Sequence, residues 1–321
     1  MRKSIIRNSI LLLLICVIPL LVQRTGYSYL IGIFVIIAIY GIVIMGYDLR
    51  LGFAGQLSFA QIAFFGIGAY GSALMTAKYS LSPILALALA LLFSMGVAFI
   101  IGHIIMLRLQ HIYLAIATLA FGEVFSRFLT GFPSFTGGAI GIYLPPFSVF
   151  GFKFDSDIKF YYLACIMALA FFIFSTNIIR SRWGRSLLAL NSDEQAARCM
   201  GINTAKCKIQ VFITSVCYAS IAGSFYAHFQ NFVVPEQFSV AHSIELILML
   251  FIGGTRTVWG GFIGVTILQV LPEVSEWLAD YRPFVSGTLL IVILIFMPKG
   301  IVGTLIEFWR DRWAKSSGNR K

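Results

Sequence analysis

The sequence is poor in charged residues. Only 12% of its 321 residues are Asp, Glu, Lys or Arg, whereas a soluble domain carries roughly 25%. Hydrophobic residues make up 59% of the chain, and its mean hydropathy is +0.90. A soluble core of this apolarity would have too few polar side chains to cover its surface. The composition therefore excludes an ordinary soluble protein and indicates a chain dissolved in a lipid bilayer.

The motifs of several catalytic and metal-binding classes are also missing. There is no Gly-x-x-x-x-Gly-Lys-Ser/Thr phosphate loop, no His-Glu-x-x-His, no Gly-x-Ser-x-Gly and no cluster of paired carboxylates. The five cysteines form no Cys-x-x-Cys and no Cys/His spacing typical of a metal site. We therefore predict that the chain is not an enzyme, holds no metal or cofactor and needs no disulfide.

Long apolar runs dominate what is present. They are continuous rather than alternating and about 20 residues long, which predicts membrane-spanning helices and argues against a β-barrel. We expect an all-α polytopic fold with about ten spans, at 9–23, 29–47, 54–77, 83–106, 112–130, 160–179, 209–231, 240–256, 260–277 and 284–306. The two spans within 240–277 are short and interrupted by glycine pairs, so an eight-span arrangement with a re-entrant segment there remains open.

The distribution of basic residues predicts the topology. With ten spans and a cytoplasmic N-terminus, 18 of the 24 Lys and Arg residues fall on the cytoplasmic side and five outside. This is the positive-inside pattern, and it places both termini in the cytoplasm. The net charge of +11 is therefore explained by basic residues in the loops at the cytoplasmic membrane surface, and it does not indicate a nucleic-acid partner. The basic tail 307–321 is expected to be solvated or to face lipid.

The loop 180–208, predicted to be cytoplasmic, contains a short helix. Ser192 and Gln195 match a capping box, Asp193 and Glu194 occupy the favourable first turn, and Gly201 is a natural stop. We expect this helix, Asp193 to Met200, to expose its small or adaptable side chains, which are Ala196, Ala197, Cys199 and Met200. Such a helix either docks in a groove of another protein or simply links two spans.

Polar residues interrupt the apolar run that begins after residue 52. Gly55, Gln56, Ser58 and Gln61 lie near a predicted membrane face, where polar groups need internal partners. One interpretation is an unwound turn beside a cavity, which makes these residues candidates for a translocation pathway. The alternative is close helix packing through small residues, as in Gly68-x-x-x-Ser72.

Glu123 and Arg127 lie four residues apart within the span 112–130. The acid precedes the base, which is the favourable order for an ion pair on one helix face. Because single charges are costly in a membrane, we expect a structural pair that faces the protein interior. Contact of Glu123 with a charged substrate is the alternative.

Several motifs resemble one known family. They are Gly-Tyr-Asp-Leu-Arg-Leu-Gly-Phe-Ala-Gly-Gln-Leu-Ser at 46–58, Gly-Arg-Ser at 184–186, Ser-Asp-Glu-Gln-Ala-Ala at 192–197, Met-Gly-Ile at 200–202, and the glycine-rich pieces at 251–264 and 297–303. Over about residues 30–305 the chain resembles the branched-chain amino-acid ABC transporter permeases of the LivH/LivM family, and within it the LivM-like members. It departs from their pattern at Arg256, where they usually have glycine, and at Gly261, where they usually have proline.

The resemblance implies the fold and the partners. It implies a single permease domain over 1–321, embedded as a multi-pass protein in a bacterial inner membrane. The implied partners are a second, LivH-like permease, two cytoplasmic ABC ATPases that use ATP and Mg, and a periplasmic solute-binding protein. The residues implied in ATPase coupling are Gly184, Arg185, Asp193, Glu194, Ala196, Ala197, Met200 and Gly201.

The solute implied by the resemblance is a branched-chain or related amino acid. The same kind of importer for urea or short amides is an alternative. An ion-coupled secondary transporter is a second alternative, although it would usually carry charged sites at mid-membrane, and Glu123 with Arg127 is the one candidate pair.

Overall fold

The structure, a computed structural model, describes residues 29–106, 108–109, 111–149, 152–154 and 156–274, with a few positions between 284 and 304. The predicted first span at 9–23, about half of the predicted last span at 284–306, both termini and the tail 307–321 lie outside the described residues. The topology predicted for the termini is therefore not addressed by the fold.

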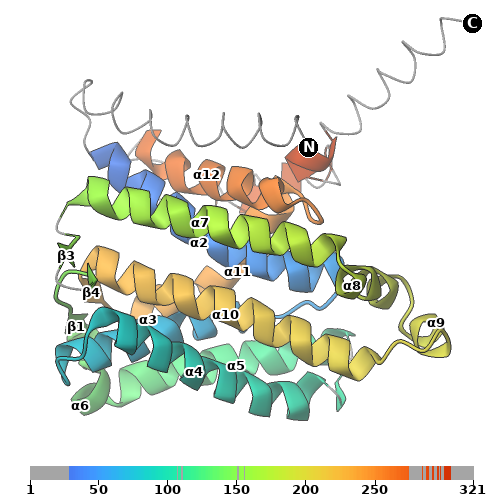
Figure 1. Cartoon of the computed structure of the whole chain (residues 1–321), viewed down its shortest axis with the longest axis horizontal. Helices are drawn as coiled ribbons and strands as arrows, with labels where there is room; N and C mark the ends of the chain where they lie inside the picture. Colours follow the sequence, from blue (N-terminus) through green and yellow to red (C-terminus); the bar gives the residue numbers. More distant parts are fainter. Residues whose placement is uncertain are drawn as a thin grey trace, which may run out of the picture.

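Helices dominate the described residues, as the sequence predicts (Figure 1). The α-helices are α2 (Tyr29–Asp48), α3 (Gln61–Ala77), α4 (Pro83–Ile101), α5 (His111–Gly131), α6 (Pro133–Thr136), α7 (Asp157–Arg180), α8 (Arg182–Ser192), α9 (Glu194–Cys199), α10 (Thr204–Gln230), α11 (Val240–Gly253) and α12 (Val258–Val274). Two π-helical turns, η1 (Leu49–Phe53) and η2 (Gly102–Met106), extend α2 and α4, and two 3₁₀ turns are η3 (Gly138–Ile140) and η4 (Pro235–Phe238).

The described residues also contain four two-residue strands, which the predicted all-α fold did not include. They are β1 (Ile142–Tyr143), β2 (Ser148–Val149), β3 (Phe152–Lys153) and β4 (Phe232–Val233). β1 pairs antiparallel with β4, with Ile142 opposite Val233, and β2 pairs antiparallel with β3. These strands lie at one end of the helical bundle, and α8 and α9 lie at the other (Figure 1). We call these the strand end and the α9 end.

Five described helices are long and apolar enough to cross a membrane. They comprise residues 29–53, 83–106, 112–131, 157–180 and 204–230, and the bent pair α11–α12 counts as a sixth if it forms one span. The chain bends by 119° between α11 and α12, which fits the re-entrant alternative better than two independent spans. The predicted boundaries agree with these helices to within a few residues, except in the span predicted at 54–77.

That predicted span is a helix only from Gln61 onward. Residues 54–60 are irregular, because Gly55 has φ +70° and the Gln56 N–H bonds back to the Arg50 carbonyl at 3.0 Å. A positive φ is costly for most residues and free for glycine. Within this segment Gln56 and Ser58 are buried, whereas Gly55 is exposed.

α3 and α10 form the packed centre of the bundle. A Cβ on Gly68 would collide with the Ser220 carbonyl, and a Cβ on Gly223 would collide with the Phe65 carbonyl. The Ser224 hydroxyl donates to the Gly68 carbonyl at 3.0 Å. The packing interpretation of the small residues is therefore confirmed: they let two backbones approach closely, as membrane helices require.

Candidate functional site

The short helix of the predicted coupling loop is α9. Its N-cap is Asp193, whose Oδ1 accepts from the N–H groups of Gln195 and Ala196 at 2.8 and 3.0 Å. The predicted cap at Ser192 is wrong, because Ser192 still belongs to α8 and donates to the Leu188 carbonyl. A carboxylate satisfies two helix N–H groups and also opposes the positive end of the helix dipole.

The side chains of α9 differ in exposure. Met200 is 82% exposed, and Ala196 and Cys199 are also exposed. The prediction that Ala197 is exposed is wrong: this residue is 3% exposed, since it forms the inward face of the turn. Gly201 ends the helix in the left-handed conformation, with φ +80°, as a C-terminal glycine does.

Charged contacts hold α9 against α10. Glu194 pairs with Arg198 along α9 and with Lys208 on α10, both at 2.6 Å, and Arg198 Nε donates to the Thr204 hydroxyl. Partial burial alone would raise the pKa of Glu194, but the hydrogen bonds and charges of Lys208 and Arg198 outweigh it and lower the pKa below its ordinary value of 4.5. The pair Glu194–Lys208 is thus a fixed link between α9 and the adjoining long helix.

A second link joins α8 to η1, directly before the irregular segment 54–60. The Asn191 amide donates to the Gly52 carbonyl at 2.9 Å, and the same carbonyl accepts from Arg256 Nε at 3.0 Å. The Arg256 backbone N–H in turn donates to Asp48 Oδ1 at 2.8 Å. The Gly52 carbonyl of η1 therefore connects the end of α8 with the α11–α12 turn.

Gly184 and Arg185 occupy different environments in α8. Gly184 packs against the carbonyls of Ile178 and Ile179, where a Cβ would collide. Arg185 is exposed. The glycine therefore sets the tight α7–α8 corner, whereas the arginine is available at the surface.

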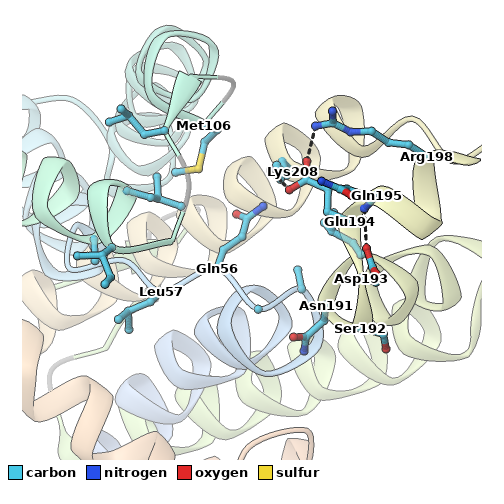
Figure 2. A pocket seen from close by; sticks show the side chains of 17 residues that line it. Gln56, Leu57, Met106, Asn191, Ser192, Asp193, Glu194, Gln195, Arg198 and Lys208 are labelled. Atoms are coloured by element: carbon cyan, nitrogen blue, oxygen red, sulfur yellow. Dashed lines mark hydrogen bonds and ion pairs between the residues drawn. The ribbon is translucent and has the colours of Figure 1, made fainter.

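A cavity of about 790 Å³ lies between α9 and the irregular segment. Figure 2 shows Gln56 pointing into it, with Glu194, Gln195 and Lys208 on one side and Leu57 and Met106 on the other. The lining comprises Ala54, Gly55, Gln56, Leu57, Met106, Leu109, Ile112, Leu114, Ala115, Leu190, Asn191, Ser192, Asp193, Glu194, Gln195, Arg198 and Lys208. The unwound turn beside a cavity, predicted from the polar residues after residue 52, is present.

The four polar candidates of this segment separate into two pairs. Gly55 and Gln56 line the cavity. Ser58 and Gln61 do not, since both are buried inside the bundle. The Ser58 carbonyl accepts from the Tyr47 hydroxyl at 2.6 Å, and Gln61 exchanges two hydrogen bonds with Ser215 on α10.

Glu123 and Arg127 form the predicted ion pair, with Arg127 Nε 2.7 Å from Glu123 Oε1. The predicted inward orientation is wrong. The side chains are 46% and 80% exposed, and they project from an α5 face that also exposes Val124 and Phe128. The helix turns its smaller residues inward, among them Gly122 beside the Phe59 carbonyl, and this leaves the charges on the outer face.

Three contributors were not predicted from the sequence as site residues. Asn191 and Arg256 lie 139 and 204 residues from the Gly52 carbonyl that they bind, and Lys208 lies 14 residues from Glu194 across the turn between α9 and α10. Contacts at these separations leave no local sequence pattern. Arg256 alone left a signal, because it replaces a family glycine, and its φ is +62°. Within the described part of the chain, no three His, Cys, Asp or Glu residues form a potential metal site.

Comparison with known proteins identifies the family. The family model described as the branched-chain amino acid transport system permease component matches residues 29–294. The chain is 30% identical to the high-affinity branched-chain amino acid transport permease LivM of Salmonella typhimurium, over 88% of this chain and 71% of that protein. It is 29% identical to LivM of Escherichia coli K12, over 82% and 68%.

More distant relatives cover a similar share of the chain. LivH of Salmonella typhimurium is 27% identical over 82% of this chain and 91% of that protein. No solved structure matches the chain. With the family model covering most of its length and LivM relatives over more than four fifths of it, the chain belongs to the branched-chain amino acid transport permease family, as a multi-pass membrane protein of the transport machinery.

Proposed function

We propose that the chain is an inner-membrane permease subunit of an ATP-driven importer, and that α9 transmits the work of separate ATPase subunits into the bundle. The observation that carries the proposal is the double attachment of the α8–α9 corner, through Glu194 to Lys208 and through Asn191 to Gly52. α9 also presents Met200 and Ala196 outward. A displacement of the α8–α9 corner would therefore reach both α10 and η1, which directly precedes the irregular segment.

The charge distribution supports the orientation that we propose for the protein in the membrane. The α9 end, which carries the basic loop 180–208, faces the cytoplasm, and the strand end faces the periplasm, where a solute-binding protein delivers its cargo. ATP and Mg are used by the ATPases and not by this chain. Relatives named LivM and LivH support a pair of different permeases in one complex.

The exposed ion pair on α5 supports the same pairing. Glu123 and Arg127 are exposed within a helix apolar enough to span the membrane. A charged pair facing hydrocarbon is costly, so such residues usually face protein or a water-filled space. We place the second permease, or the pathway between the two permeases, against this face of α5.

The test uses Met200, because its exposed side chain can be changed without disturbing the packing of the chain. Met200→Arg should abolish ATP-dependent uptake in vesicles containing the complete complex, since a charged side chain would enter the ATPase groove. Met200→Leu, which keeps size and polarity, should retain uptake. Both variants should reach the membrane in equal amounts. Normal uptake with Met200→Arg would refute the coupling role of α9.

The solute class needs a separate measurement. The family and its named relatives favour branched-chain or related amino acids. Uptake of leucine, urea and acetamide by the same complex, each with its own competitor series, discriminates among the candidate solutes. Uptake that persists without the ATPases, and that stops when the ion gradient across the membrane is dissipated, would favour the secondary-transporter alternative.

A further inference from the structure

The turn that ends α2 contains most of the buried polar groups that lack a hydrogen-bond partner. Among the described residues, eight buried side-chain nitrogen and oxygen atoms have no partner, and six of the eight belong to Asp48, Arg50 and Gln56. These three residues are 2%, 0% and 5% exposed. Buried polar groups nearly always have a partner, because leaving them without one is costly. Their concentration within residues 48–56 therefore indicates a function.

Arg50 bears the largest part of this cost. All three of its guanidinium nitrogens lack a hydrogen-bond partner, and it lies in a helix apolar enough to span the membrane. Its Cζ lies 4.4 Å from the centroid of the Phe212 ring on α10. A cation–π contact attracts the charge but supplies no hydrogen-bond acceptor, so it offsets only part of the cost of burying a guanidinium. Arg50 therefore destabilises the conformation that the structure shows.

A complementary charge lies two residues away. Asp48 Oδ2 is a buried oxygen without a partner, whereas Asp48 Oδ1 accepts from the Arg256 N–H in the α11–α12 turn. Arg50 faces α10 instead. Residues two apart do not face each other on a helix, but they lie on the same side of an extended chain. Helical winding therefore keeps the two charges apart, and unwinding would bring them together.

The backbone around these residues is suited to such a change. Residues 49–53 form the π-helical turn η1, and π-helical turns are rare and frequent at functional sites. The irregular residues 54–57 that follow line the cavity beside α9, and Figure 2 shows Leu57 at its wall. The chain that follows η1 therefore has open space beside it into which it can move.

Two routes connect η1 to α9. The Asn191 amide, at the end of α8, donates to the Gly52 carbonyl of η1. Lys208, which binds α9 through Glu194, lies four residues before Phe212 on α10. Residues four apart lie on the same face of a helix, so the face of α10 that binds α9 also contacts Arg50. A displacement of α9 therefore acts on η1 from two sides.

We propose that η1 is a two-state element of the transport cycle. In the observed state the turn is wound and Arg50 lies unpaired against Phe212. In the second state the turn is unwound toward the cavity, and Arg50 forms an ion pair with Asp48 that lowers the cost of both charges. Displacement of α9 selects between the states because the Asn191 bond to η1 is made in one of them only. This inference rests on the proposed function for the role of α9, whereas the cost of burying Arg50 does not depend on it.

Arg50→Met distinguishes this positioning role from a purely structural one. Methionine keeps an apolar stem and removes the unpaired charge, so the Tm of the permease–ATPase complex in nanodiscs should rise by at least about 2 °C. ATP-dependent uptake should fall at least about tenfold, because the second state loses its ion pair. A structural role predicts that both decrease. Arg108→Met is the matched control, since Arg108 is exposed and lies outside the cavity lining, and it should change neither.

A second variant tests the pairing. Asp48→Asn keeps an oxygen that can accept from the Arg256 N–H and removes the charge that Arg50 would bind. Uptake should fall as it does in Arg50→Met, and the double variant should transport no worse than the poorer single variant, because both changes remove the same pair. Fully additive losses would show that the two residues act separately and would contradict the pairing.

A third measurement follows the movement. Ala54 comes directly after η1, lines the cavity and is 4% exposed. Ala54→Cys is combined with Cys199→Ser, and the maleimide labelling of Cys199→Ser alone is subtracted. The labelling rate at residue 54 should differ at least about tenfold between the nucleotide-free and the vanadate-trapped complex, because unwinding uncovers this position in one of the two states. Adding Arg50→Met should remove most of the difference.

Three results would overturn the inference: a lower Tm of Arg50→Met, unchanged uptake in that variant, or equal labelling of residue 54 in both nucleotide states. If one of them is found while Met200→Arg abolishes uptake, only this inference fails. If Met200→Arg transports normally, the proposed coupling through α9 fails, and a higher Tm of Arg50→Met still supports the cost assigned to the unpaired Arg50.

Discussion

Lys208 Nζ lies 2.6 Å from Glu194 Oε2, and this contact joins α9 to the second turn of α10. The Lys208 side chain is 13% exposed and the Glu194 side chain 22%. Ion pairs on open surfaces contribute little because water screens them. The low exposure of both partners makes this pair more effective, and removal of one partner leaves the other poorly solvated.

Replacing Glu194 should impair coupling more than replacing Lys208. Glu194→Gln weakens the contacts to both Lys208 and Arg198, whereas Lys208→Met leaves the contact with Arg198 intact. We therefore expect ATP-dependent uptake to decrease in the order unmodified protein, Lys208→Met, Glu194→Gln. Uptake rates in vesicles with matched protein levels test the order. If Lys208→Met were the more damaging change, the link would not run through Glu194.

The pH dependence of this link follows from the lowered pKa of Glu194. A carboxyl group whose pKa is lowered by folding stabilises the fold above its ordinary pKa, and that stabilisation is lost as the pH falls through the lowered value. The contribution of the Glu194 contacts to the free energy of unfolding should therefore stay constant from about pH 8 to about pH 5. The difference in melting temperature between the unmodified protein and Glu194→Gln should be flat over this range. A difference that vanished near neutral pH would contradict the assignment.

Arg256→Ala should destabilise the protein more than Arg256→Gly. Its φ of +62° costs a non-glycine residue about 1 kcal/mol, and its Nε bond to the Gly52 carbonyl offsets part of that cost. Arg256→Ala loses the bond and keeps the strain, whereas Arg256→Gly loses the bond and relieves the strain. Thermal unfolding should rank the alanine variant below the glycine variant, by about 1 kcal/mol. Equal melting temperatures would show that the strained backbone relaxes in the alanine variant.

The local features of the fold could be predicted from the sequence, and its long-range contacts could not. Continuous apolar runs gave the long helices, and the polar interruption after Gly52 gave the unwound segment, because each rests on neighbouring residues. The inward rotation of Ala197 and the outward rotation of Glu123 depend on which helix packs against which face. That choice is made by tertiary contacts, and neither helix has a polar stripe clear enough to predict it.

The same distinction applies to the candidate site. The helix at 193–200 and its first-turn acids were predicted from capping chemistry, with an error of one residue at the cap. The two hydrogen bonds to the Gly52 carbonyl were not predicted, because their donors, Asn191 and Arg256, lie 139 and 204 residues away in the sequence. Neither donor belongs to a local motif.

The ion pair on α5 gives a prediction about assembly. Glu123→Gln and Arg127→Gln each leave one exposed charge on a membrane helix, and each should weaken association with the second permease because the remaining charge is unpaired at the interface. Co-purification of the two permeases after mild solubilisation measures this. The swapped variant, with Arg at 123 and Glu at 127, should recover most of the association. Recovery is expected to be incomplete, since base-before-acid is the weaker order on a helix.

A native cysteine tests which side of the membrane carries α9. Cys199 is exposed, whereas Cys207 is buried and Cys165 and Cys217 are half-buried. A membrane-impermeant maleimide should therefore label Cys199 in inside-out vesicles and not in sealed right-side-out vesicles, because the proposed orientation places α9 in the cytoplasm. Cys199→Ser identifies the signal that belongs to this residue. Added ATPase subunits should protect Cys199 if they cover α9. Labelling from the periplasmic side would reverse the orientation and remove the physical basis for coupling to a cytoplasmic ATPase.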